Sequence, residues 1–171
     1  MITEPSKPVE LDSIPNVGDL REFYSTFGGI LFYFDHQSGD AGKYLAPPSA
    51  WGELQEHFSS WLEILGEDER EEILPNWIGS ALVIGETPRS GDYILIPTEG
   101  EVAGHVFEFD HDGFEFHCEA ESLATYIEQL LQPSSRKLTE IASHMRFMVD
   151  GTQWWIRELR DNYGHVAQTN A

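Results

Sequence analysis

The sequence contains little cysteine and little positive charge, and each shortage excludes a class of protein. A single Cys among 171 residues cannot form an intramolecular disulfide, which fits a reducing compartment. The ten Lys and Arg are outnumbered by 30 Asp and Glu, and the formal net charge is −20 at pH 7. Binding to nucleic acid or to an anionic membrane depends on cationic side chains, so we expect neither as a partner. The charge favours a basic partner, with simple solubility as the alternative explanation.

Long hydrophobic runs and a signal peptide are also missing. No run approaches the ~18 apolar residues that a membrane-spanning helix requires. The first 15 residues are polar, contain Pro5, Pro8 and Pro15, and lack a basic segment followed by an apolar one. We therefore predict a soluble, cytoplasmic protein.

The hydrophobic content, by contrast, is that of a folded domain. Hydrophobic residues make up 40% of the chain and aromatic residues 12%, far more than a disordered acidic chain contains. A chain of this length is comfortable for one domain and tight for two. We predict a single domain over residues 1–171, in which residues 1–15 form an N-terminal arm.

Hydrophobic spacing predicts helices at both ends of a mainly antiparallel sheet. The helical pattern, with apolar residues three or four apart, covers residues 17–27, 51–65, 123–131 and 134–145. The acidic stretch after Gly66 predicts a further short helix over residues 67–74, which Pro75 would end. Short apolar runs typical of strands cover residues 30–34, 81–84, 93–96, 102–110 and 114–118. The Gly-rich residues 35–48 predict a loop, and Asp150-Gly151 predicts a hairpin turn or a helix end. This order indicates an α+β fold.

The register of one hairpin can be predicted from the sequence. If Asp112-Gly113 forms a two-residue type I′ turn, four cross-strand pairs follow: Phe107 with Cys118, Glu108 with His117, Phe109 with Phe116, and Asp110 with Glu115. One face is then aromatic, with Cys118 as a small buried hydrophobe and His111 at the rim. The other face carries carboxylates and a histidine.

The polar face of this hairpin is the candidate binding surface. Its carboxylates lie opposite one another, which is unfavourable in isolation. We predict that it meets a basic partner, and that reversing Glu108, Asp110 and Glu115 to Lys abolishes binding and leaves the fold intact. The alternative is a solvated outer face whose mild repulsion is tolerated. The candidate contact residues are Glu99, Glu101, Glu108, Asp110, Asp112 and Glu115.

Signals for catalysis and for metal binding are weak. Strand alternation puts His105 and His111 on the face opposite the polar residues, which opposes a metal site. His117 and Cys118 also point to opposite faces, so they cannot form a nucleophile and base. The sequence has no phosphate-binding loop, dinucleotide fingerprint, G-x-S-x-G or H-E-x-x-H pattern. We expect no cofactor, no metal and no catalytic residue, although 30 acids leave a carboxylate-dependent hydrolase as an alternative.

An ordered set of motifs resembles a known family. Leu74-Pro75-x-Trp77-Ile78 is followed by Ile84-Gly85-Glu86-x-Pro88-x-Ser90-Gly91-Asp92-Tyr93-x-Leu95. Next come Gly104-x-Val106-Phe107-x-Phe109-Asp110-His111-Asp112-Gly113 and a Ser122-Leu123 helix ending in Leu130-Leu131. Over about residues 20–131 this order resembles the SUKH superfamily, named for Syd and the Smi/Knr cell-wall regulators.

The resemblance implies an α+β fold with a curved, largely antiparallel sheet flanked by helices. Many bacterial members are immunity proteins that neutralise a partner toxin, often a nuclease, and fungal relatives are regulatory binding proteins. A nuclease holds nucleic acid with basic residues, so an acidic protein can occupy that site as an electrostatic decoy. We therefore predict a non-catalytic immunity protein whose partner is a toxin domain. A regulatory scaffold without any toxin is the alternative among binding proteins.

Overall fold

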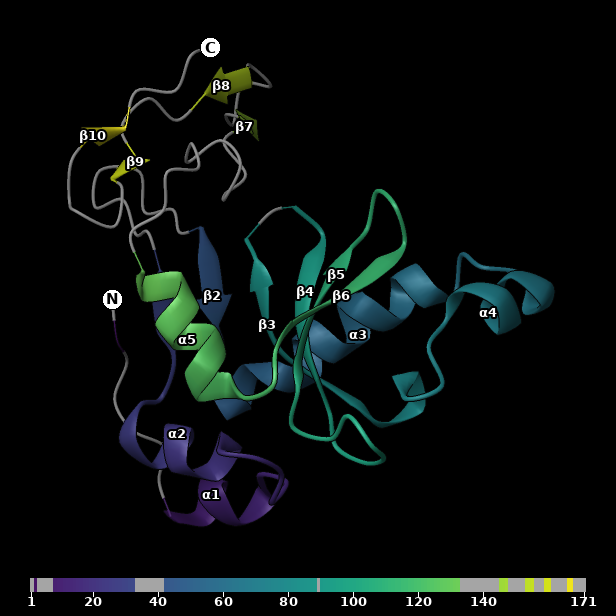
Figure 1. The fold of residues 1–171 in the computed structure, drawn as a ribbon. Helices are drawn as coiled ribbons and strands as arrows, with labels where there is room; N and C mark the ends of the chain where they lie inside the picture. Colours follow the sequence, from purple (N-terminus) through teal and green to yellow (C-terminus); the bar gives the residue numbers. More distant parts are fainter. Residues whose placement is uncertain are drawn as a thin grey trace.

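The computed structural model describes residue 2, residues 8–32, 42–88 and 90–132, and four short strands between residues 145 and 167 (Figure 1). Six strands form one sheet: β1 (Ile30–Phe32), β2 (Lys43–Leu45), β3 (Ala81–Thr87), β4 (Asp92–Pro97), β5 (Val106–Asp110) and β6 (Glu115–Ala120). They pair in sequence order and every pair is antiparallel. The predicted α+β fold with an antiparallel sheet is confirmed. The sheet is not strongly curled, so the curvature implied by the resemblance is not confirmed.

Helices flank the sheet on both faces. They are α1 (Pro8–Ser13), α2 (Leu20–Thr26), α3 (Trp51–Leu62), α4 (Glu67–Ile73) and α5 (Leu123–Leu131), with 3-10 turns η1 (Pro48–Ala50) and η2 (Ile78–Ser80). Phe58 of α3 packs on the ring of Phe109 at 5.3 Å between centroids, so α3 covers the aromatic face. The Tyr126 hydroxyl of α5 donates to Glu108, the neighbour of Phe109 along β5, so α5 lies on the opposite face.

The centre of the core is β4, which is buried on both faces. Its residues 93–96 are at most 6% exposed, as expected for an apolar strand with helices on both sides. The backbones of β3 and β2 lie very close together at Gly85, where an added Cβ would lie 2.2 Å from the carbonyl oxygen of Tyr44. Only glycine permits this contact between β3 and β2.

Two sets of hydrogen bonds fix the start of α5. The Ser122 hydroxyl accepts from the Thr125 amide at 3.1 Å and so caps the N-terminus of the helix. The Asp19 carboxylate accepts from the amides of Leu123 at 3.1 Å and Ala124 at 2.7 Å. The N-terminal half of the chain is thereby joined directly to α5, whose position covers the candidate hairpin.

Three predicted segments differ from the structure by more than the ends of an element. The N-terminal arm contains α1, and the predicted loop 35–48 contains β2, a strand of three residues that is too short to give a pattern. The predicted strand 102–110 begins only at Val106, because residues 101–104 form turns and Gly104 has a φ of +87°. Each difference involves a short element or a turn that hydrophobic spacing alone does not mark.

Towards the C-terminus, the structure describes only short strands. β7 (Met145–Phe147) pairs antiparallel with β8 (Gln153–Trp155), which agrees with the hairpin, one of the two predicted alternatives, although the strands differ in bounds from the predicted 147–149 and 154–156. The predicted turn at residues 150–151 lies outside the described residues. β9 (Leu159–Arg160) pairs with β10 (Val166–Ala167). The predicted helix 134–145 lies outside the described residues except for Met145, which is in β7. No helix in the described part of the chain has the length and apolar character to cross a membrane.

Candidate functional site

The hairpin that carries most candidate residues has the predicted register. Glu108 pairs with His117, Phe109 with Phe116 and Asp110 with Glu115. The turn differs from the predicted type I′, because residues 111–114 form it together and Phe114 has a φ of +52°. The change from two to four turn residues leaves the cross-strand pairs unchanged, so each side chain points to its predicted face of the sheet.

The aromatic face of the hairpin is covered by α3, but Cys118 is not buried. The Phe109 ring is buried, whereas the Cys118 thiol is exposed, which corrects the prediction of a buried hydrophobe. Its Sγ lies 3.9 Å from Nδ1 of His105. Partial burial, together with the charges of Glu119 and Glu121, raises the pKa of Cys118, which favours the neutral thiol over the thiolate.

Glu108 is partly buried and is paired within the protein, so it is less accessible than the other candidates, and its role in binding a partner stays a prediction. Its Oε2 lies 2.6 Å from Nζ of Lys43, and its Oε1 accepts a short hydrogen bond from the Tyr126 hydroxyl. The side chains of Lys43 and Glu108 are only 11% and 23% exposed. Glu108 therefore joins β2, β5 and α5, and reversing it to Lys would leave two cations together under α5 instead of preserving the fold.

The other five candidates lie in two separate groups. Asp110, Asp112 and Glu115 are exposed at the turn between β5 and β6, a group that we call the hairpin tip. Glu99 and Glu101 are exposed in the loop after β4, at the opposite end of the strands (Figure 1). At about 3.4 Å per residue, β5 separates the two groups by roughly 17 Å. The predicted single acidic face is thus two acidic surfaces.

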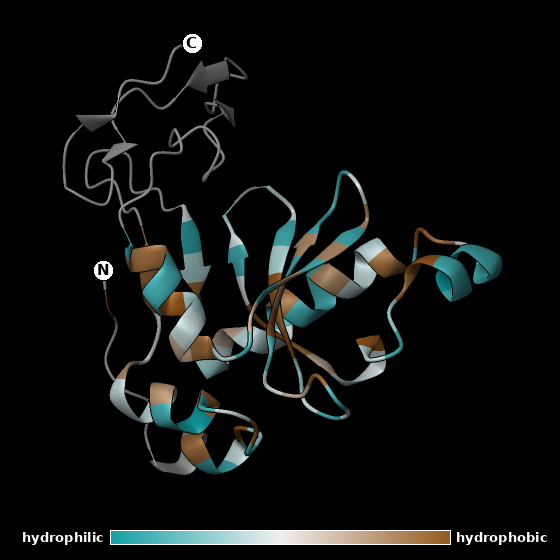
Figure 2. Ribbon diagram, viewed as in Figure 1, coloured by the Kyte–Doolittle hydropathy of each residue, from teal (hydrophilic) through white to brown (hydrophobic). Residues whose placement is uncertain are grey.

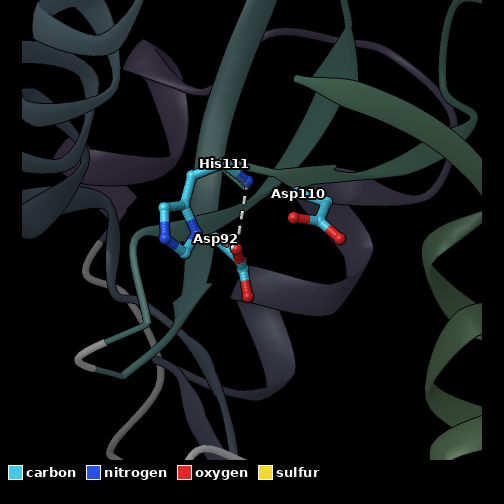
Figure 3. A group of neighbouring side chains, drawn as sticks. All are labelled: Asp92, Asp110 and His111. Carbon is cyan, nitrogen blue, oxygen red and sulfur yellow. Dashed lines mark hydrogen bonds and ion pairs between the residues drawn. The ribbon is translucent and has the colours of Figure 1, made fainter. Parts of the chain in front are cut away.

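The hairpin tip is fixed to β4 by a group that sequence reasoning missed. Nδ1 of His111 lies 2.8 Å from Oδ1 of Asp92, and the same oxygen accepts from the His111 amide at 3.2 Å (Figure 3). The imidazole also packs against Trp61 of α3, with 5.0 Å between ring centroids. Oδ1 of Asp110 accepts from the amide of Asp112 at 2.9 Å, which stabilises the turn itself.

Asp92, Asp110 and His111 are also the residues that could approach a metal ion together. One ligand atom from each lies within 4.8 Å of the others. However, both nitrogens of the His111 ring already face carboxylates, since Nε2 lies 3.2 Å from Oδ1 of Asp112. In the structure these three residues make hydrogen bonds that hold the turn between β5 and β6 in place. No sequence pattern marks this group, because Asp92 comes from a different strand.

Negative charge is concentrated in the part of the chain that forms the sheet. Residues 1–132 contain 26 of the 30 acids and five of the ten bases, a net charge of −21, whereas residues 133–171 carry +1. The described cations are engaged within the fold: Lys43 with Glu108, Arg21 with the Ile14 carbonyl at 2.6 Å, and Arg70 with the Leu65 carbonyl at 3.1 Å. The acids of the hairpin tip therefore face solvent in a strongly negative surrounding.

The acidic helix α4 adds to this potential. All seven of its residues are exposed, and it is largely hydrophilic and projects away from the sheet (Figure 2). Glu69 accepts from the Gly66 amide at 2.9 Å, which caps the helix start. The prediction of a short acidic helix after Gly66 is confirmed.

A half-buried carboxyl lies on the α3 face of the sheet. Glu86 is the cross-strand neighbour of both Tyr44 and Tyr93. Burial raises the pKa of Glu86, while His57 of α3 lowers it and Glu53 raises it further. The negative charge of Glu86 is therefore unfavourable in the folded protein.

Replacing Glu86 with Gln should stabilise the protein at pH 7 by about 0.5 kcal/mol, allowing for solvent screening of this half-exposed group. Because the folded pKa is the higher one, the folded state retains the proton longer, and stability falls as pH rises through the range between the unfolded and folded pKa. The stability gained by Glu86→Gln should therefore vanish at a pH below the ordinary pKa of a carboxyl group. Urea denaturation at pH 3 and pH 7 measures this. Glu56→Gln, an exposed change on α3, is the control. An equal gain at both pH values would contradict the assigned cause.

No protein-family model and no curated protein sequence matches the chain. The likeness to the SUKH superfamily therefore rests on the motifs given above and stays a prediction.

Proposed function

We propose that the chain is a non-catalytic binding protein of the SUKH type that neutralises a basic protein, a toxin domain, in the cytoplasm. The observation that supports this most is the concentration of charge: the sheet-forming part carries −21, and the carboxylates of the hairpin tip are exposed, while the described cation Lys43 is engaged internally by Glu108. The toxin as partner comes from the resemblance alone.

The hairpin tip is suited to binding because its support is rigid. Asp92 and Trp61 hold His111, and Asp110 fixes the turn, so Asp112 and Glu115 project from a preformed base. Their side chains are 89% and 64% exposed. Little ordering entropy is then lost when a basic surface docks. If the toxin is a nuclease, these carboxylates would occupy the positions that its basic residues offer to phosphates.

A regulatory scaffold would use the same surface. An immunity protein differs from a scaffold in its partner, which is toxic to the cell when it is expressed without the immunity protein. The partner is identified by capture on the immobilised protein at low salt and by mass spectrometry, and is then expressed in the source cell. We expect a basic protein that arrests growth alone and that is harmless when co-expressed with the wild-type chain. A partner without toxicity would contradict the immunity role and favour the scaffold.

Matched charge reversals test the surface in the same cells. The double variant Asp112→Lys with Glu115→Lys should lose protection, because two carboxylates at the tip become cations. The control Asp12→Lys with Glu22→Lys makes the same charge change at α1 and α2, away from the tip, and should still protect. Equal protection by both variants would contradict binding at the tip.

A further inference from the structure

A groove lies at the end of the sheet opposite the hairpin tip. Its volume is about 940 Å³, within the range of sites that bind small molecules or short peptides. It is lined by Pro15, by the segment that runs through η2 into β3, and by the loop after β4. This loop carries Glu99 and Glu101, the two candidate acids that the structure separates from the hairpin.

Hydrogen bonds hold the walls of the groove in place. The amide and the hydroxyl of Thr98 both donate to the Ser80 carbonyl, at 3.0 and 2.9 Å. The amide and the hydroxyl of Ser80 both donate to the Trp77 carbonyl at 2.9 Å. The loop after β4 closes on itself through the Gly104 amide, 3.0 Å from the Pro97 carbonyl. The groove is therefore preformed.

The lining of the groove has the chemistry of a cation site. Two exposed carboxylates, Glu99 and Glu101, line it together with Trp77, and none of its described lining residues is Lys, Arg or His. Trp77 is partly exposed, and its indole is held by Phe107 at 4.3 Å and by Phe116 at 5.6 Å. Phe107 packs against one side of this indole, so a cation would approach the exposed part of the ring, and carboxylates would pair with it at the rim.

Two glycines leave room for the backbone of a ligand. A Cβ added at Gly79 or at Gly100 would meet no atom within 4 Å, and both residues line the groove. A guanidinium suits this lining better than an ammonium, because it is planar, stacks on indole and pairs with carboxylates through two hydrogen bonds.

We propose that this groove binds an arginine side chain in an extended segment of the basic partner, with the guanidinium on Trp77 and paired with Glu99 or Glu101. The inference rests on the proposed function and adds to it a second contact, separate from the hairpin tip. Two acidic surfaces about 17 Å apart along β5 would then hold one partner at two points.

The test uses the full chain and the peptide acetyl-Gly-Arg-Gly-amide, followed by ¹⁵N NMR. We expect binding on the order of 1 mM, with shifts at the amides of Gly79, Glu99 and Glu101 and at the Trp77 indole N–H. The peptide with Lys in place of Arg should bind more weakly, and the peptide with Glu should not bind. Shifts confined to residues 110–115, or equal binding of the Glu peptide, would overturn the proposal.

Matched variants distinguish binding in the groove from general attraction of the peptide by the negative charge of the protein. Gly79→Phe should fill the groove and weaken binding at least tenfold, whereas Gly52→Phe, where an added Cβ on α3 also meets no atom within 4 Å, should leave it unchanged. Glu99→Gln with Glu101→Gln should weaken binding at least fivefold, whereas the same charge change in Asp112→Asn with Glu115→Gln should not. Equal effects within either pair would overturn the assignment.

The failures of this proposal and of the proposed function can be told apart. If the captured partner binds the Gly79→Phe variant as well as the wild type but loses affinity for the Asp112→Lys with Glu115→Lys variant, the function stands and the groove assignment falls. If the peptide enters the groove but no basic partner is captured, the groove is a cation site and the proposed function falls.

Discussion

Replacing Glu108 with Gln should lower the free energy of unfolding by about 2 kcal/mol. The substitution leaves the Lys43 ammonium, whose side chain is 11% exposed, without its carboxylate. Removing one partner of a fully buried ion pair costs roughly 3–5 kcal/mol, and the partial exposure of this pair reduces the cost. Gln still offers an oxygen to the Tyr126 hydroxyl, so the loss reports mainly on the ion pair. Urea denaturation at pH 7 measures it.

The double variant Lys43→Met with Glu108→Gln supplies the control. Because it removes both charges, it should be more stable than Glu108→Gln alone, with a coupling energy of about 1 kcal/mol or more in a double-mutant cycle. Additive losses, or a loss below about 0.5 kcal/mol for Glu108→Gln, would show that the two groups do not depend on each other. We expect the folded single variant still to bind the captured partner, because Glu108 is engaged by Lys43 and Tyr126 instead of being exposed at the hairpin tip.

The register of the β5–β6 hairpin could be predicted because it depends on local information. Alternating Phe and charged residues specify which face is buried, and a shift by one residue would reverse every side chain. The turn was predicted wrongly, since Asp112-Gly113 is a common type I′ signal, whereas Asp110 bonds to the Asp112 amide and Phe114 takes the positive φ. The register was insensitive to this error because both turns are centred between Asp112 and Gly113 and so leave Asp110 paired with Glu115.

The partners of the polar face could not be predicted in the same way. Alternation places Glu108 on that face but does not say what covers it, and Lys43 lies 65 residues away in a strand of only three residues. The same holds for Asp92, which reaches His111 from 19 residues away. Glu99 and Glu101 looked close to the hairpin in sequence, yet the length of β5 carries them to the opposite end of the sheet. Tertiary contacts therefore decided which acids remain available for binding.

The second large effect is expected in the kinetics of partner binding. A charge of −21 on the sheet-forming part attracts a basic protein over a distance set by the salt concentration, about 10 Å at 0.1 M. Steered association reaches roughly 10⁸ M⁻¹s⁻¹ at low salt, against about 10⁵–10⁶ M⁻¹s⁻¹ without steering. We expect the association rate to fall about 100-fold between 20 and 500 mM NaCl, with a much smaller change in the dissociation rate.

The most direct test is therefore stopped-flow association of the captured partner with the purified wild-type chain across that salt range. The wild type should show the 100-fold fall, and the Asp112→Lys with Glu115→Lys variant should associate at least tenfold more slowly at 20 mM NaCl and depend less on salt. Association rates that do not change with salt, or that are the same for the variant and the wild type, would contradict binding through the acidic surface.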